Sequence, residues 1–131
     1  MVEKRPIRIF AVEDDAQTWQ RLIKSVVKSL EAELVVPIVA DFEAAMQLVA
    51  KLAELKVDIA ILDGNITPDK HDGLEGLALL KKIKELFPEI KVIGFSSYVQ
   101  GFKNAGADAV VDKVQSEELK PTILKLVQQQ T

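Results

Sequence analysis

The chain has 131 residues, 48% of them apolar, which is enough to bury the core of one domain spanning residues 1–131. Its 17 basic and 20 acidic residues give a net charge of -3, which argues against a nucleic-acid-binding surface. The absence of cysteine excludes disulfides and thiolate chemistry, and the absence of a long apolar run argues against a secretory signal or membrane span, so we expect a cytoplasmic protein.

The first half of the chain alternates predicted strands with predicted helices. Residues 7–12 form an apolar run that predicts a buried strand, and residues 34–39 predict a second strand, whose Pro37 favours an outer position in the sheet because proline lacks an N–H. Asp41 is a plausible N-cap for a second helix. Helical spacing is found in two apolar stripes: Trp19, Leu22, Ile23, Val26, Val27 and Leu30, and then Phe42, Ala45, Met46, Val49 and Ala53.

The same alternation continues in the second half. Apolar runs at residues 57–62, 91–95 and 109–111 predict three more strands. Gly73 introduces a third helix that Pro88 closes, and Ser116 is a plausible cap for the last helix. The apolar stripes of these helices are Leu77, Leu80, Ile83 and Phe87, and then Leu119, Ile123, Leu126 and Val127.

Five strands in βα alternation predict an α/β fold with a doubly wound, flavodoxin-like parallel sheet in the order 2-1-3-4-5. In such a sheet, ligands bind outside the carboxyl ends of the strands, where the strand order reverses. The polar residues Glu13, Asp14, Asp63, Ser96 and Lys113 all follow predicted strands, so we expect them to converge on this edge.

The convergent side chains suggest metal and phosphoryl chemistry. Carboxylates about 5 Å apart repel by about 3 kcal/mol per pair, and a shared Mg²⁺ would relieve this repulsion. Lys113 and the Ser96 hydroxyl suit a bound phosphoryl anion. Asp63, alone at its strand end, is the best candidate for a nucleophile that forms an acyl phosphate, and Asn65 could offer its carbonyl to the metal and its amide to the pocket rim.

These residues resemble the receiver domains of two-component response regulators, over nearly the whole chain. The acidic pair Glu13 and Asp14, the phosphoacceptor Asp63, the hydroxyl residue Ser96 and Lys113 all fit the family's order and spacing. The stretches Asp72-Gly73-Leu74-Glu75 and Ala105-Gly106-Ala107-Asp108 are further similarities.

The resemblance implies phosphoryl transfer to Asp63 from a histidine kinase or a histidine phosphotransfer protein, with Mg²⁺ required and an unidentified downstream protein as the output partner. It implies that Asp14 and Asp63 bind the metal directly, Glu13 through water and Asn65 through its carbonyl. It also implies a phosphorelay switch rather than an enzyme. The residues alone do not choose between Asp14 and Asp15, although Asp15 suits a helix start.

The chain departs from the family in four places. Val110 stands where receivers usually carry an aromatic residue, and Val114 stands where a proline with a cis bond commonly follows the lysine. Residues 97–105 are too few for a full fourth helix, so we expect a shortened one and an unusual output surface or oligomer. The loop at residues 66–71 is longer than usual and could shape access to the pocket.

Two other functions are open to the same residues. A pseudo-receiver would keep the fold as a phosphorylation-independent protein-interaction module, with Glu13 and Asp14 capping a helix and Lys113 solvated in a loop. A phosphatase or mutase of haloacid-dehalogenase type would also use an aspartate nucleophile, but that chemistry typically wants an acid where this chain has Asn65. The sequence ends after the last predicted helix, as expected either of a stand-alone regulator or of a receiver cut from a longer protein.

Overall fold

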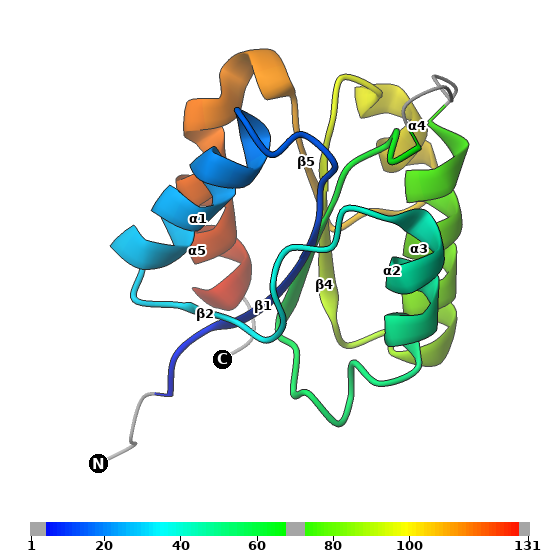
Figure 1. The fold of residues 1–131 in the computed structure, drawn as a ribbon, viewed down its shortest axis with the longest axis horizontal. Coiled ribbons are helices and arrows are strands. Elements are labelled where there is room, and N and C mark those ends of the chain that lie inside the picture. The colour runs from blue at the N-terminus through cyan, green and yellow to red at the C-terminus, as the bar shows by residue number, and fades with distance from the viewer. Residues whose placement is uncertain (1–4, 68–72, 129–131) are drawn as a thin grey trace.

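A computed structural model describes residues 5–67 and 73–128 of the chain (Figure 1). Its centre is a five-stranded sheet in the order β2-β1-β3-β4-β5, with every neighbouring pair parallel, as the sequence predicted. The strands are β1 (Arg8–Val12), β2 (Glu33–Leu34), β3 (Ile59–Leu62), β4 (Lys91–Phe95) and β5 (Ala109–Val111). Most of the loop that was expected to be lengthened after Asp63 lies outside the described residues.

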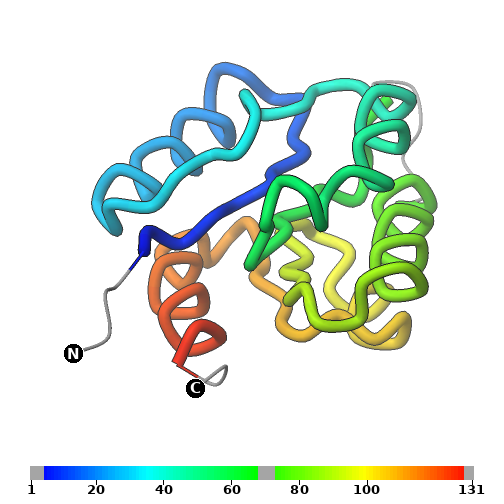
Figure 2. The backbone as a smooth tube through the Cα atoms, turned by 90° about the horizontal axis from the view of Figure 1, so that it is seen from below, coloured from blue at the N-terminus to red at the C-terminus, as the bar shows by residue number. Residues whose placement is uncertain are grey.

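Helices cover both faces of the sheet (Figures 1 and 2). One layer consists of α1 (Trp19–Ser29) and α5 (Leu119–Gln128), and the other of α2 (Phe42–Val49), α3 (Leu74–Leu86) and α4 (Val99–Asn104). A 3-10 segment, η1 (Lys113–Glu118), joins β5 to α5. Among the described residues, no helix is both long enough and apolar enough to traverse a bilayer.

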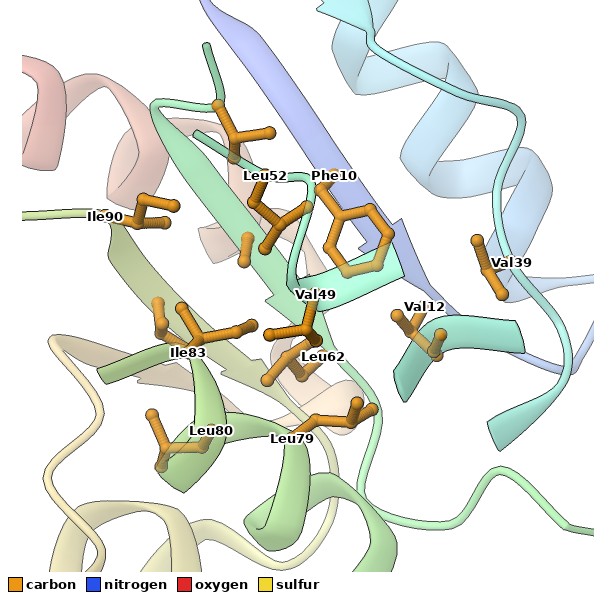
Figure 3. Close-up of a cluster of buried hydrophobic side chains, with 14 of the residues drawn as sticks. Phe10, Val12, Val39, Val49, Leu52, Leu62, Leu79, Leu80, Ile83 and Ile90 are labelled. Atoms are coloured by element: carbon orange, nitrogen blue, oxygen red, sulfur yellow. The ribbon is translucent and has the colours of Figure 1, made fainter. Parts of the chain in front are cut away.

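The two layers enclose two separate apolar cores because successive residues of a strand point to opposite faces. In β1, Ile9 and Ala11 face the α1/α5 layer, whereas Phe10 and Val12 face the α2/α3 layer. Figure 3 shows the second core, in which Phe10 and Leu62 meet Leu79 and other residues of the covering helices. The central strands β1 and β3 are therefore apolar along almost their whole length, which explains their uninterrupted hydrophobic runs.

Strand β2 is the outer strand, as Pro37 suggested, but it is shorter than predicted. Only Glu33 and Leu34 form the strand, and the chain rejoins the sheet as a single bridge between Val12 and Val39. The amide of Val39 donates to the Ala11 carbonyl at 3.0 Å. The Val35 amide still donates to the Ile9 carbonyl at 3.0 Å, and the chain leaves the ladder at residues 36–38, because Pro37 cannot donate a hydrogen bond to it.

The start of α2 and the length of α4 match the sequence predictions, whereas the start of the last helix does not. The Asp41 side chain accepts a hydrogen bond from the Ala44 amide at 2.9 Å, so the predicted N-cap of α2 is confirmed. Helix α4 has 6 residues, against 13 in α3, so the predicted shortening is also confirmed. The prediction of Ser116 as the cap of the last helix was wrong: Ser116 lies inside η1, and α5 begins at Leu119.

Helix α4 is anchored by Phe102, a fully buried side chain that needs glycine opposite it. A Cβ atom on Gly94 of β4 would lie 2.4 Å from Phe102 Cγ, closer than any real contact. A Cβ atom on Gly76 of α3 would lie 2.9 Å from Phe102 Cζ and 2.3 Å from the Asp63 carbonyl oxygen. The close approach of β4, α3 and α4 therefore depends on glycine, which has no side chain, at positions 76 and 94.

Gly94→Ala is expected to lower the free energy of unfolding by about 1–3 kcal/mol, because the new methyl group displaces the Phe102 ring in a filled core. Urea unfolding measures the loss. Gly101→Ala is the matched control: a Cβ there would come no closer than 3.7 Å to Leu77, and it should stabilise α4 by about 0.5–1 kcal/mol. Equal effects of the two substitutions would contradict this account of the packing.

Candidate functional site

The register of the sheet brings Glu13 beside Asp63. Val12 pairs with Leu62 at the ends of β1 and β3, and the Asp63 amide donates to the Val12 carbonyl at 3.0 Å. The next residue of each chain segment is an acid, and both side chains are buried. Two apolar strands that end in step thus force two carboxylates together at the carboxyl edge of the sheet, the place where such folds bind ligands.

Asp14 completes the acidic group, and Lys113 reaches it from the segment after β5. Glu13, Asp14 and Asp63 each offer a carboxylate oxygen, and these oxygens all lie within 4.8 Å of one another. The Nζ atom of Lys113 lies 2.9 Å from Glu13 Oε1 and 3.2 Å from Asp63 Oδ1. The structure therefore brings together four of the site residues that the sequence singled out.

Three carboxylates share one ammonium group, and the pKa values of two of them are raised. Burial raises the pKa of Glu13 to about 8, with a further rise from the charge of Asp63 that the neighbouring Lys113 opposes. Burial also raises the pKa of Asp14, and the nearby Asp63 adds to that rise. A divalent cation fits such a group, because three carboxylate oxygens suit a hard ion such as Mg²⁺, whose positive charge would take the place of the protons that these acids otherwise hold.

Ser96 is buried at the end of β4, and its hydroxyl already has a partner. The Ser96 amide donates to the Val111 carbonyl at 3.1 Å, and its Oγ accepts a hydrogen bond from the Tyr98 amide at 3.1 Å. A Cβ atom on Gly64 would lie 2.8 Å from this Oγ, so the hydroxyl sits against the residue that follows Asp63. Ser96 thus links the end of β3 to the start of α4.

Two further predicted residues have different tasks. The Asn65 side chain turns to the start of α3, where its Oδ1 accepts a hydrogen bond from the Gly73 amide at 2.8 Å. Asp15 accepts hydrogen bonds from the Gln17 and Thr18 amides at 3.0 and 2.9 Å, ahead of α1, which confirms it as a helix-start residue. Asn65 therefore shapes the loop after Asp63 through its side chain.

The chain matches the family model described as "Response regulator receiver domain" over residues 9–124. The chain belongs to this family. The chemotaxis protein CheY of Listeria monocytogenes is 33% identical over 118 residues, which cover 86% of this chain and 92% of that protein, and the CheY of Listeria innocua matches equally well. Receiver domains are signalling modules of two-component systems, so the class predicted from the sequence is confirmed.

Solved receiver structures share the fold. The response regulator domain of Thermotoga maritima CheB has a TM-score of 0.69 and 25% identity, and the match covers 95% of this chain and 96% of that domain. The "BeF3 Activated DrrB Receiver Domain" has a TM-score of 0.71 at 22% identity, with 95% of this chain and 99% of that chain covered. The predicted flavodoxin-like order 2-1-3-4-5 is therefore that of the receiver fold.

Sequence reasoning missed three residues around this receiver's pocket. Trp19, which the sequence placed in an apolar helical stripe, is half-buried against the core, and its ring lies beneath the Lys113 ammonium together with the ring of Phe95. Glu75 is buried, and its carboxylate accepts hydrogen bonds from the Ile66 and Thr67 amides at 3.1 and 2.6 Å. The apolar stripe of α1 included Trp19, and the stretch Asp72-Gly73-Leu74-Glu75 included Glu75, but neither pattern indicated these contacts.

Of the two valines that depart from the receiver pattern, Val110 lies within β5 and Val114 lies in η1. Val110 is half-buried and packs against the α2/α3 core, so no aromatic ring occupies that position. Val114 is 84% exposed directly beside Lys113. Its peptide bond is trans, as are all others in the part of the chain that the structure describes.

Without Mg²⁺, the free energy of unfolding is expected to fall as the pH rises from about 4.5 to about 8. The ordinary pKa of Glu13 is 4.5, and its raised value in the fold is about 8. Between these values the folded state holds a proton that the unfolded state has released, so raising the pH favours unfolding. Urea unfolding at intervals across this window measures the slope, and saturating Mg²⁺ should flatten it.

Glu13→Gln is the control for this pH series, because the amide cannot titrate. Every other titratable group is present in both proteins, so its contribution cancels in the difference between them. The variant should lose much of the downward slope, and what remains belongs to groups such as Asp14. An equal slope in both proteins would show that Glu13 is not the titrating group.

Proposed function

We propose that this receiver accepts a phosphoryl group on Asp63, in a Mg²⁺-dependent reaction, from the phosphohistidine of a histidine kinase or a histidine phosphotransfer protein. The observation that carries the proposal is the position of Lys113, whose ammonium contacts both Glu13 and Asp63 beside the third acid. A loop lysine without a role in the site would stay in water. Here the lysine side chain is only 14% exposed.

The residues that would hold Mg²⁺ are Glu13, Asp14 and Asp63, with the backbone carbonyl of Asn65. The ion would supply positive charge to the oxygens of the incoming phosphoryl group. Asp14 and Asp63 would bind it directly and Glu13 through water. Lys113 supplies the second positive charge, so that an anion can approach a site that otherwise repels it.

The transfer itself is a displacement at phosphorus. A carboxylate oxygen of Asp63 forms the new O–P bond while the N–P bond of the donor phosphohistidine breaks, and the imidazole leaves with that electron pair and regains a proton from solvent. Lys113 and the Ser96 hydroxyl then contact the phosphoryl oxygens of the acyl phosphate. The protein ends the step as an aspartyl phosphate.

The output is a change of protein surface rather than turnover of a substrate. Ser96 Oγ now accepts a hydrogen bond from the Tyr98 amide, and we expect its movement towards the phosphoryl group to break this bond and loosen the start of α4. A helix of 6 residues has little stability of its own. We propose that residues 1–131 act as one receiver domain in the cytoplasm, and that a downstream protein reads the region of Tyr98 and α4, with no role for nucleic acid or membrane.

A second function is favoured by three specific departures. Val110, the exposed Val114 and the short α4 would suit a pseudo-receiver, a protein-interaction module that works without phosphorylation. Such a module would have no use for a buried cluster of acids around a lysine, because the cluster costs stability. We therefore place phosphorylation first.

Incubation with Mg²⁺ and a small phosphodonor such as phosphoramidate is expected to add the mass of one phosphoryl group to the intact protein. Asp63→Asn should abolish the gain, because an amide oxygen does not form an acyl phosphate. Lys113→Ala should slow it by about a hundredfold or more, because a charged contact to the transferred group is lost. Intact-mass spectrometry over time measures all three.

Two controls complete this experiment. Chelation of the metal should prevent the gain in wild type, and Asp15→Asn should leave it near the wild-type level, because Asp15 serves the turn before α1. No gain in wild type, or a gain that survives Asp63→Asn, would favour the pseudo-receiver instead.

Titration with beryllofluoride and Mg²⁺ is expected to move the Tyr98 amide resonance strongly, because that amide loses its hydrogen bond to Ser96 Oγ. Ser96→Ala should already show a displaced Tyr98 resonance before the titration and only a small further change. Amide resonances of the far strand β2 serve as the internal reference. A Tyr98 shift no larger than those of β2 would refute this route to the output surface.

A further inference from the structure

The ammonium of Lys113 lies over two aromatic rings as well as beside two carboxylates. Its Nζ atom is 5.3 Å from the ring centroid of Trp19 and 5.7 Å from that of Phe95. The rings also contact each other edge to face, with centroids 5.6 Å apart and planes at 88°. A cation within about 6 Å of a ring face is attracted by the negative charge there, most strongly by tryptophan.

The two rings come from rigid parts of the fold. Phe95 is the last residue of β4, fully buried and next to Ser96. Trp19 is the first residue of α1, half-buried, and it follows the turn that Asp15 stabilises. The edge-to-face contact fixes one ring against the other. Together they form a wall that we call the aromatic wall, Trp19 and Phe95.

The lysine, by contrast, stands at the start of a short 3-10 segment, which Asp112 caps through the Val114 amide at 3.1 Å. It begins η1, in which Gln115 has backbone angles outside the helical range, and the next residue, Val114, is almost fully exposed. A lysine side chain has four rotatable bonds and a strongly hydrated head. Nothing in η1 itself would keep that head in the pocket, so its position depends on what surrounds it.

The carboxylates alone cannot hold the ammonium in one place throughout the proposed reaction. Asp63 Oδ1 is one of its two ion-pair partners, and phosphorylation would change the charge and bonding of that very group. Glu13, the other partner, would turn to a metal-bound water when Mg²⁺ is present. The aromatic wall is neutral, so its attraction for the ammonium is the same before and after transfer.

We propose that Trp19 is a positioning residue for Lys113: its indole face, backed by Phe95, keeps the ammonium dry and directed at the phosphoryl group on Asp63. The inference deepens the proposed function and rests on it for its kinetic consequence. The receiver would then owe part of its rate of phosphorylation to a residue that touches neither metal nor phosphorus.

Trp19 is the single tryptophan of the chain, so biosynthetic incorporation of fluorinated tryptophans changes this residue alone. Fluorine withdraws charge from the ring face with little change of shape, which weakens the attraction without a cavity. At saturating Mg²⁺, the rate constant for phosphorylation by phosphoramidate should fall stepwise from native to mono-, di- and trifluorinated protein, by about fivefold in all. Urea midpoints should stay together across the series.

Substitutions give an independent measure. Trp19→Leu should slow phosphorylation by about tenfold, and Trp19→Phe, which keeps a ring face, should recover part of the loss. Val27→Ala is the matched control, because it removes buried methyl groups from the same helix α1 on the core side. It should lower the urea midpoint while leaving the rate constant near wild type.

The ε-methylene proton resonance of Lys113, assigned by its loss in Lys113→Arg, reports the geometry without any chemistry. It should lie upfield in wild type because of the ring currents, and should move towards the ordinary lysine position in Trp19→Leu and, in steps, with fluorination. Equal rate constants across the fluorinated series, or an ordinary lysine resonance in wild type, would overturn the proposal.

The two proposals fail in different ways. If wild type gains no phosphoryl group at all, the proposed function is wrong, and the Lys113 resonance still decides whether the aromatic wall holds the ammonium. If wild type is phosphorylated but the fluorinated proteins react at the same rate, the function stands and the positioning role of Trp19 is refuted.

Discussion

The interaction on which the site depends is the contact of one ammonium with two buried carboxylates at the carboxyl edge of the sheet. Lys113 reaches Glu13 and Asp63, but the group also contains Asp14, so one positive charge faces three acids. At an effective dielectric near 20, each close pair of like charges costs a few kcal/mol. The raised pKa values of Glu13 and Asp14 express this imbalance. The pocket is thus built to take up a positive charge.

The contrast with Glu75 shows that burial alone does not make an acid functional. Glu75 is as buried as Asp63, yet its oxygens accept hydrogen bonds from the Ile66 and Thr67 amides and from the Thr67 hydroxyl at 2.6 Å. These donors satisfy a charge and fix the loop after Asp63. Glu13 has far less, since its Oε2 accepts one long bond from the Asp15 amide and its Oε1 has the ion pair with Lys113. An acid satisfied by amides belongs to the scaffold, whereas an acid left with too few donors can bind a ligand.

The sequence predicted those parts of the structure that follow from periodicity and strand ends. Alternating apolar runs gave the sheet order, and the acids after two of those runs gave the pocket, because parallel strands end at one edge. It failed where long-range geometry decides. A six-residue pattern at 34–39 concealed how little of β2 pairs with β1. Trp19 fitted an apolar stripe, and only the fold shows that its ring lies under Lys113. Glu75 stands in the stretch Asp72-Gly73-Leu74-Glu75 that resembled the family, but its hydrogen-bond partners are eight or nine residues away, so its contacts could not be predicted from the local sequence.

The short α4 connects the pocket to the surface through two contacts of different kinds. Its buried end is fixed by Phe102, which fills space that Gly76 and Gly94 leave open, so that end is rigid. Its start depends on the Ser96 hydroxyl, which serves the Tyr98 amide. Val110 provides no aromatic ring to follow Ser96, whereas Tyr98 bonds to the Ser96 hydroxyl through its amide and covers Gly73 at the start of α3 with its ring. A movement of Ser96 would therefore be passed to the surface through Tyr98, and this route does not need a full-length fourth helix.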